Sequence, residues 1–201
     1  MNDTKERILT TALQLFARDG YEAVSVSDIA QALGMTKGAL YKHYKNKRDL
    51  FDSMIQRMLE LDSTAARQYG MPEQAFQADE SGYDQVDWDD LKRFTLAQFR
   101  FWTEDAFACP LRRMLSLEQY RSEEMGKLYQ EMVVSGPVHY TADIFRRMMK
   151  NGRMKPSDAD TLAAQFYAPM FLLIAMADGG TGDGLSVLQS LIDDFAGRWR
   201  I

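Results

Sequence analysis

Apolar residues recur every three or four positions along most of the chain, which is the spacing of amphipathic helices. Residues 4–19 have this spacing first, and Gly20 follows as a helix stop signal. Longer helices are predicted farther on, at about 48–69, 88–107, 111–117, 121–150, 157–177 and 185–199. No stretch of the sequence has the alternation typical of strands, so the pattern predicts an all-α fold.

Local signals predict where these helices begin and where they are interrupted. Asp87 is expected to cap one helix, and Ser157 with Asp160 has the form of a capping box. Pro110 is expected to break the chain, and the pair Gly136–Pro137 to kink or break a long helix. The polar, acidic stretch 71–90 has little periodicity and is expected to be largely a loop.

Two short helices joined by a tight turn are predicted after Gly20. Ser25, with Asp28 three residues later, has the capping-box form that starts a helix, and Gly34 closes that helix. Thr36 is the natural N-cap of the next helix, which we expect to reach about residue 43. Such a pair is a helix-turn-helix motif, and its second helix fits the major groove of DNA, which is about 12 Å wide.

The distribution of charge supports this interpretation. The chain of 201 residues has a formal net charge of -5, yet residues 1–47 hold seven Lys/Arg against five Asp/Glu. Residues 33–51 contain no acid before Asp49 and carry five cations: Lys37, Lys42, Lys45, Lys47 and Arg48. A positive segment on an acidic protein is expected to face a polyanion such as DNA.

Residues 5–55 resemble the N-terminal domain of the TetR family of transcriptional regulators. The matching positions are Phe16, Gly20, Tyr21, Ser25, Ile29, Ala30, Gly34, Lys37, Gly38, Leu40, Tyr41, Tyr44, Lys47, Leu50 and Phe51. The resemblance implies an N-terminal helix-turn-helix DNA-binding domain of three helices at 1–47. It also implies a larger helical domain at 48–201 that binds an effector and forms the homodimer.

The resemblance further implies which residues contact double-stranded DNA: Ser25, Ser27, Thr36, Lys37, Gly38, Ala39, Tyr41, Lys42, His43 and Lys47. Lys37 would reach a base or a phosphate, and Tyr41 would offer its hydroxyl to a phosphate or its ring to a thymine methyl group. Gly38 and Ala39 lack bulk and would let the backbone approach the groove. Lys47 would hold a phosphate, whereas the acidic Asp28 is expected to cap its helix and to avoid DNA.

Aromatic and methionine side chains in the second domain suit a pocket for a small apolar or aromatic effector. The candidate lining residues are Phe94, Phe101, Trp102, Tyr120 and Phe166. For each of them a place in the hydrophobic core is the alternative interpretation. Tyr120, Arg121 and Glu124 could add polar specificity to this pocket, or could mark a helix boundary with ion pairs on the surface.

The resulting hypothesis is a repressor that binds a pseudo-palindromic operator as a homodimer, through helices near 157–177 and 185–199, and is released by its effector. The alternatives are an activator, a regulator controlled by a protein partner, and a helical small-molecule carrier or enzyme. No catalytic motif supports an enzyme, and no cofactor is expected.

Several other features are expected to be structural. Cys109 is the only cysteine, so no intramolecular disulfide can form, and we expect it in the core. His43 and His139 have no neighbouring ligands in the sequence, so no metal site is expected. The apolar run 162–177 is short for a bilayer span of about 20 residues and is expected to be a buried helix. With no signal peptide recognised at the N-terminus, a cytoplasmic location is expected.

Overall fold

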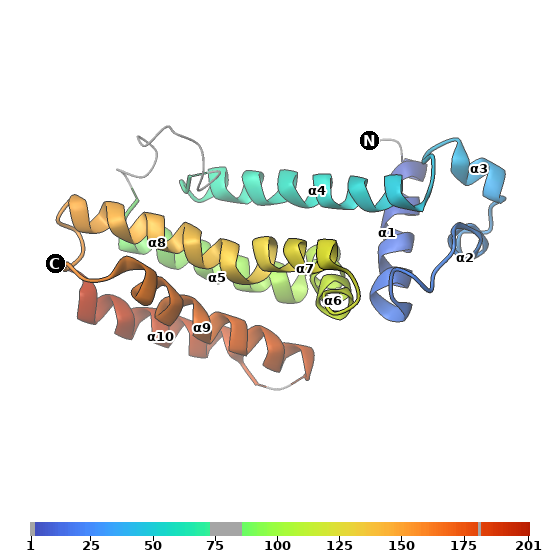
Figure 1. The fold of residues 1–201 in the computed structure, drawn as a ribbon. Helices are drawn as coiled ribbons and strands as arrows, with labels where there is room; N and C mark the ends of the chain where they lie inside the picture. The colour runs from blue at the N-terminus through green and yellow to red at the C-terminus, as the bar shows by residue number, and fades with distance from the viewer. Residues whose placement is uncertain (1–2, 73–85, 181) are drawn as a thin grey trace. The chain divides into compact units, whose positions relative to one another are not determined.

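Helices make up the fold of the residues that the computed structural model describes, which are 3–72, 86–180 and 182–201. Over those ranges it has no strand and one isolated bridge, between Met154 and Arg200 (Figure 1). The predicted all-α class is confirmed. Most of the stretch expected to be a loop, residues 73–85, lies outside the described residues.

The first of two compact units contains residues 1–61 and 106–129. Its helices are α1 (Asp3–Asp19), α2 (Val26–Ala32), α3 (Lys37–Tyr41), the larger part of α4 (Lys47–Gln68), α6 (Ala108–Glu118) and α7 (Glu123–Tyr129). The core of this unit includes the fully buried side chains Phe16, Ile29, Leu40, Leu50 and Phe51. Tyr21 fixes the turn after α1 to this core, since its ring lies 5.1 Å from that of Phe16 and 5.3 Å from that of Phe51.

The second unit contains residues 62–105 and 130–201. It holds the end of α4 and the helices α5 (Trp88–Glu104), η2 (Gln130–Val134), α8 (Ser135–Lys150), α9 (Ala159–Asp178) and α10 (Gly184–Trp199). Its core is rich in aromatic rings: Phe145 stacks on Phe195 at 5.8 Å, and both meet Phe166 edge to face. The two units are defined by contacts between residues, which do not test function. The boundary expected at residue 47, between the DNA-binding domain and the effector-binding domain, therefore stays a prediction.

A π-helical segment interrupts the long helix predicted over 121–150, as the pair Gly136–Pro137 indicated. Pro137 has no N–H to bond the carbonyl of Val133 four residues earlier. That carbonyl instead accepts a hydrogen bond of 2.6 Å from the buried hydroxyl of Tyr167 in α9. A side chain at Gly136 would place its Cβ only 1.8 Å from the carbonyl oxygen of Glu131, so the wide turn requires glycine.

Two predictions about helix starts were wrong and one is confirmed. Asp87 caps α5 with a reciprocal box, as expected. The N-cap of α9 is Asp158, not Ser157, because the carboxylate of Asp158 accepts from the backbone N–H of Thr161 at 2.8 Å. Pro110 does not break the chain, because it lies in the first turn of α6, where backbone N–H groups have no helical partner to lose.

The apolar helix α9 is only half covered by its own chain. It is long and apolar enough to cross a membrane by length and composition, and 44% of its most apolar 18-residue window is buried. Its buried face packs on α8 and α10. The other face leaves Phe171, Leu172 and Met176 exposed, so the expectation of a fully buried helix holds for one face only.

Candidate nucleic-acid interface

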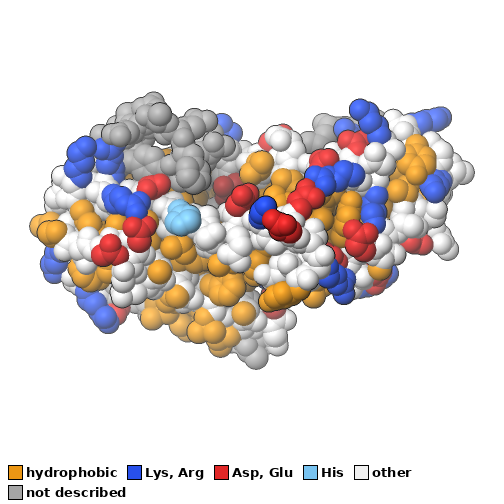
Figure 2. Space-filling view, viewed as in Figure 1, with side chains coloured by type: hydrophobic (Ala, Val, Ile, Leu, Met, Phe, Trp, Pro, Cys, Tyr) orange, Lys and Arg blue, Asp and Glu red, His pale blue; other side chains and the backbone are white. Residues whose placement is uncertain are grey.

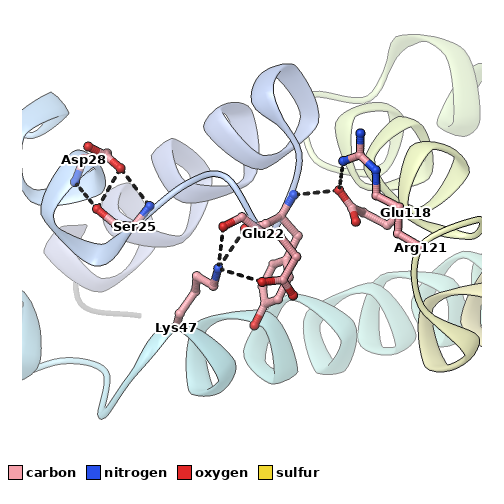
Figure 3. Close-up of polar contacts among 7 residues, drawn as sticks. Glu22, Ser25, Asp28, Lys47, Glu118 and Arg121 are labelled. Atoms are coloured by element: carbon pink, nitrogen blue, oxygen red, sulfur yellow. Dashed lines mark hydrogen bonds and ion pairs between the residues drawn. The ribbon is translucent and has the colours of Figure 1, made fainter.

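The start of α2 is fixed by a reciprocal capping box. The hydroxyl of Ser25 accepts from the backbone N–H of Asp28 at 3.2 Å, and a carboxylate oxygen of Asp28 accepts from the backbone N–H of Ser25 at 2.8 Å (Figure 3). Hydrogen bonds from Ser25 to the charged carboxylate lower the pKa of Asp28. Asp28 is therefore engaged as a helix cap, as its acidic character suggested, while Ser25 and Ser27 stay exposed at the helix start.

A left-handed glycine and a second cap connect α2 to α3. Gly34 has a φ of +65°, a conformation that L side chains rarely adopt, so the tight turn favours glycine. Thr36 then caps α3, because its hydroxyl accepts from the backbone N–H of Ala39 at 3.2 Å. The predicted caps are confirmed, although α3 spans Lys37–Tyr41 and ends before His43.

Helix α3 points most of its side chains away from the core. Leu40 is its one buried residue, and Lys37, Tyr41 and the following Lys42 are exposed. The ammonium of Lys37 lies 5.8 Å from the ring centre of Tyr41, so these two side chains occupy one surface. Ala39 and His43 are half-buried beside it.

Three of the five cations in this segment have no ion pair within the described part of the chain: Lys37, Lys42 and Lys45. The other two are engaged. Lys47 donates to the backbone carbonyl of Tyr21 at 2.9 Å and stands 4.4 Å from the centre of that ring. Arg48 forms an ion pair with Asp52 and a bidentate one with Glu124.

Gly38 lies on the exposed surface of α3 and has open space where a side chain would stand. A Cβ built there meets no heavy atom within 4 Å, and its φ lies outside the region reserved for glycine. A helical glycine costs about 0.5–1 kcal/mol relative to alanine. Folding therefore gives no reason for glycine at this position, whereas close approach of another molecule would give one.

The candidate effector residues do not all meet. Phe94 and Phe101 line an open hollow of about 360 Å³ together with Tyr69, Gln98, Arg100 and Glu104. We call it the α4–α5 hollow. Trp102 and Phe166 are buried outside its lining and match the alternative interpretation as core residues. Tyr120 belongs to the first unit and is 87% exposed, so it does not line this hollow.

Sequence reasoning missed Tyr69 and Gln98 as lining residues. Gln98 is four residues after Phe94, so the helical spacing that links Phe94 with Phe101 could have identified it. Its amide also donates at 3.0 Å to the carboxylate of Asp62, whose pKa burial raises above its ordinary value. No periodic signal in the sequence indicates Tyr69, which directly follows α4.

The remaining candidates behave as structural residues. Arg121 pairs with Glu118 and Glu124 pairs with Arg48, which matches the alternative of ion pairs for these side chains. Cys109 is buried, as expected. Within residues 3–72, 86–180 and 182–201, no group of three His, Cys, Asp or Glu side chains could hold a metal ion.

Comparison with known proteins supports the resemblance of the N-terminal residues to the DNA-binding domain of TetR-family regulators. Residues 8–54 match the family described as "Bacterial regulatory proteins, tetR family". Over 52 residues the chain is 44% identical to the HTH-type transcriptional regulator AcrR of Shigella flexneri. This match covers 26% of the chain and 24% of that relative, so the chain spans about a quarter of the relative's length.

Solved structures extend the similarity of fold to nearly the whole chain. A putative TetR-family regulator from Mesorhizobium loti has a TM-score of 0.69 and 15% identity, with 98% of this chain and 96% of that one covered. A putative transcriptional regulator from Saccharomonospora viridis, solved in complex with choline, has a TM-score of 0.68 and 22% identity, over 98% and 97%. These named relatives are transcriptional regulators and not enzymes.

Proposed function

We propose that this chain, a member of the TetR family through its N-terminal domain, is a transcriptional regulator that binds an operator as a homodimer and responds to a small molecule. The observation that carries the proposal is the exposed surface of α3, with Lys37, Tyr41 and Lys42 outward and free of ion pairs among the described residues. The protein is proposed to act in the cytoplasm, because that is where its operator DNA would lie.

In the proposed complex α3 lies in the major groove. Its first residues, Thr36 and Lys37, approach base edges, as the N-terminal residues of recognition helices do. Gly38 and Ala39 let the backbone come close, and Tyr41, Lys42 and His43 reach toward bases and phosphates. Ser25 and Ser27 offer hydroxyl and backbone N–H groups to a phosphate at the start of α2.

Lys47 has a different part in this proposal from the three unpaired lysines. Its ammonium is already bonded to the carbonyl of Tyr21 and is paired at 3.8 Å with Glu22 (Figure 3). A phosphate contact by Lys47 would be made in addition to these bonds or in exchange for them. Lys37, Lys42 and Lys45 therefore provide the larger part of the electrostatic attraction to DNA, and Lys42 and Lys45 alone would contact about four phosphates per dimer.

The homodimer is proposed to form through α9 and α10. Their outward side chains include the exposed apolar residues Phe171, Leu172, Met176, Val187 and Leu191. Figure 2 shows apolar side chains gathered over the part of the second unit where Figure 1 draws these two helices. An apolar surface of this kind is typical of a protein interface, and a two-fold interface gives the two DNA-reading helices needed for a pseudo-palindrome.

The proposed effector site is the α4–α5 hollow. Aromatic rings of Tyr69, Phe94 and Phe101 supply apolar surface, and Gln98, Arg100 and Glu104 supply polar groups, which suits a small apolar or aromatic molecule. The structural neighbour with choline binds a small molecule on a similar fold. In this proposal the DNA-bound dimer represses transcription, and binding of the effector releases it from the operator.

Selection of bound sequences from random double-stranded DNA tests the proposal. We expect enrichment of a pseudo-palindrome whose half-sites are about one DNA turn, 34–36 Å, or a multiple of it apart. The variant Lys37→Ala/Lys42→Ala serves as a control and should enrich nothing. If the unaltered protein enriches no sequence, the assignment as a DNA-binding regulator is wrong.

A further inference from the structure

The backbone of Tyr21, in the turn between α1 and α2, is held from two sides. Its N–H donates to Oε1 of Glu118 at 3.0 Å, and its carbonyl accepts from Nζ of Lys47 at 2.9 Å. Figure 3 shows Glu118 and Lys47 reaching this turn from different helices, α6 and α4. Tyr21, Lys47 and Glu118 all belong to the first compact unit.

Glu118 fits the turn too closely to be incidental. Its side chain is 1% exposed, and its carboxylate also accepts from Arg121 at 3.2 Å. A Cβ at Gly20, which has a φ of +92°, would stand 2.9 Å from Oε1 of Glu118. Burying a carboxylate is costly unless hydrogen bonds compensate it, so its position depends on the N–H of Tyr21 and the guanidinium of Arg121.

A second contact joins the α6–α7 segment to the N-terminal helices of the first unit. Arg48, the second residue of α4, makes two hydrogen bonds of 2.8 and 2.6 Å to the carboxylate of Glu124 in α7. The pair is exposed, so it adds little stability alone, but its bidentate geometry fixes an orientation. The segment α6–α7 is therefore tied to both the turn before α2 and the start of α4.

Tyr21 stands four residues before Ser25, which starts α2, and α2 carries the turn that sets α3. We propose that Glu118 is a positioning residue for DNA binding: by holding the N–H of Tyr21, it lets the placement of α6 fix the placement of α2 and α3. This proposal rests on the proposed function. It adds a route from α6 to the reading helices through the α1–α2 turn.

Chain connectivity links the proposed effector site to α6. Asp105 lines the α4–α5 hollow and stands three residues before Ala108, the first residue of α6. A ligand that shifts the end of α5 would therefore act on α6 through a three-residue link. Any displacement of Glu118 would then alter the hydrogen bond to Tyr21.

Three variants separate positioning from simple stabilisation. Glu118→Ala removes the acceptor of the Tyr21 N–H, whereas Glu118→Gln keeps one oxygen acceptor, removes the charge and replaces the other oxygen by an NH2 group. Glu123→Ala is the matched control, since it removes one carboxylate from the same segment, where Glu123 is exposed and pairs with Lys127 alone among the described residues. Operator affinity per active dimer and backbone hydrogen exchange of residues 16–34 are measured well below the melting temperature.

We expect Glu118→Ala to weaken operator binding by about 5- to 150-fold, the usual range of coupling between sites, and to speed exchange in residues 21–34. Glu118→Gln and Glu123→Ala should stay within about twofold of the unaltered protein in affinity. If Glu118→Ala does not fold, Glu118→Asp replaces it, because the shorter side chain withdraws the acceptor and keeps the charge.

The proposal is wrong if Glu118→Ala lowers only the melting temperature, with affinity and local exchange unchanged. It is also wrong if Glu118→Gln loses as much affinity as Glu118→Ala, since charge would then be the cause. Failure of the unaltered protein to bind any operator would overturn the proposed function, and with it any role for Glu118 in DNA binding. The exchange measurement would still show whether Glu118 holds the turn.

Discussion

At the scale of single residues, side chains in one short segment have different partners. Lys37 and Lys42 project from α3 without an ion pair in the described residues, whereas Lys47 is bonded to Tyr21 and Arg48 to Asp52 and Glu124. Charge in the segment thus divides into a part available to a polyanion and a part that holds the first unit together.

Tyr41→Ala should weaken operator binding and leave the fold intact. The side chain of Tyr41 is 43% exposed and contacts Lys37 on the surface, so its removal opens no cavity. Loss of a base or phosphate contact costs about 1–3 kcal/mol, which is roughly a 5- to 150-fold drop in affinity. Gel-shift titration and thermal melting measure the two effects.

The control for this variant is Tyr120→Ala, which removes an exposed tyrosine from another surface. It should change neither affinity nor melting temperature. Equal operator affinity for Tyr41→Ala and the unaltered protein would exclude Tyr41 from the interface.

Asp62→Asn should stabilise the second unit near neutral pH. Burial raises the pKa of Asp62, and its hydrogen-bond partner among the described residues is the neutral amide of Gln98. The folded protein therefore binds the proton more tightly than the unfolded chain, so the free energy of unfolding falls as pH rises above about 3.9, the ordinary pKa of an aspartate. An asparagine oxygen can still accept from Gln98 and has no charge to desolvate.

Melting curves as a function of pH check this prediction. The gain in melting temperature for Asp62→Asn should be largest near pH 7 and should vanish below the ordinary pKa of aspartate. A loss of stability at pH 7 would show that the charged carboxylate has a cationic partner.

At the scale of elements, replacing a glycine by alanine is expected to have opposite effects on stability in two helices, α3 and α8. Gly38→Ala should raise the free energy of unfolding by about 0.5–1 kcal/mol, because a Cβ there meets open space within a helix. The same substitution should weaken operator binding, since the methyl group would stand between the backbone and the groove. Denaturant unfolding and gel-shift titration together test this pair of effects.

Gly136→Ala is the counterpart at the start of α8, directly after the π-helical segment η2. Its Cβ would stand 1.8 Å from a backbone oxygen, so the turn must rearrange, at a cost of about 1–3 kcal/mol. Denaturant unfolding should show the loss. A neutral result would mean that the junction of η2 and α8 can rearrange into regular α-helix without loss of stability.

Elements set by neighbouring residues were predictable from the sequence. The caps Ser25, Thr36 and Asp87 bond within three residues, so their signals are local. The interruption near Pro137 was predictable for the same reason, but the bond from Tyr167 that completes it comes from 34 residues away. Ser157 was mistaken for a cap because Ser157 and Asp158 both suit the position, and backbone conformation decides between them.

The candidate sites, too, were predictable only where the contacts lie between residues close in sequence. Local spacing indicated the exposed face of α3, but the partners of Lys47 and Arg48 depend on how distant segments pack. Glu118 lies 97 residues from Tyr21, and no periodic pattern connects a carboxylate with a backbone N–H at that separation. The lining of the α4–α5 hollow likewise joins α4 with α5, which composition alone could not pair.

At the scale of the whole molecule, the proposal requires a dimer. Leu172 is 60% exposed on the outer face of α9, so Leu172→Glu places a charge in the proposed interface without disturbing the core. We expect this variant to be monomeric at micromolar concentration by light scattering and to lose operator affinity, since one half-site supplies only part of the contacts. Its melting curve should retain a cooperative transition.

Leu59→Glu provides the matched control for the dimer. Leu59 is 49% exposed on α4 in the first unit, so the same charge is introduced on a helix that is not part of the proposed interface. It should leave the dimer intact. A monomeric unaltered protein, or a dimeric Leu172→Glu variant, would contradict the proposed interface.

The most direct test of the central claim is the salt dependence of operator affinity for the unaltered protein, Lys42→Ala and Lys127→Ala. Lys127 is an exposed lysine on α7, paired with Glu123 and remote from α3 in sequence. Losing one phosphate contact from each subunit should flatten the slope of log affinity against log salt by about two units for Lys42→Ala. Lys127→Ala should keep the original slope; identical slopes for all three proteins would contradict DNA binding by the α3 surface.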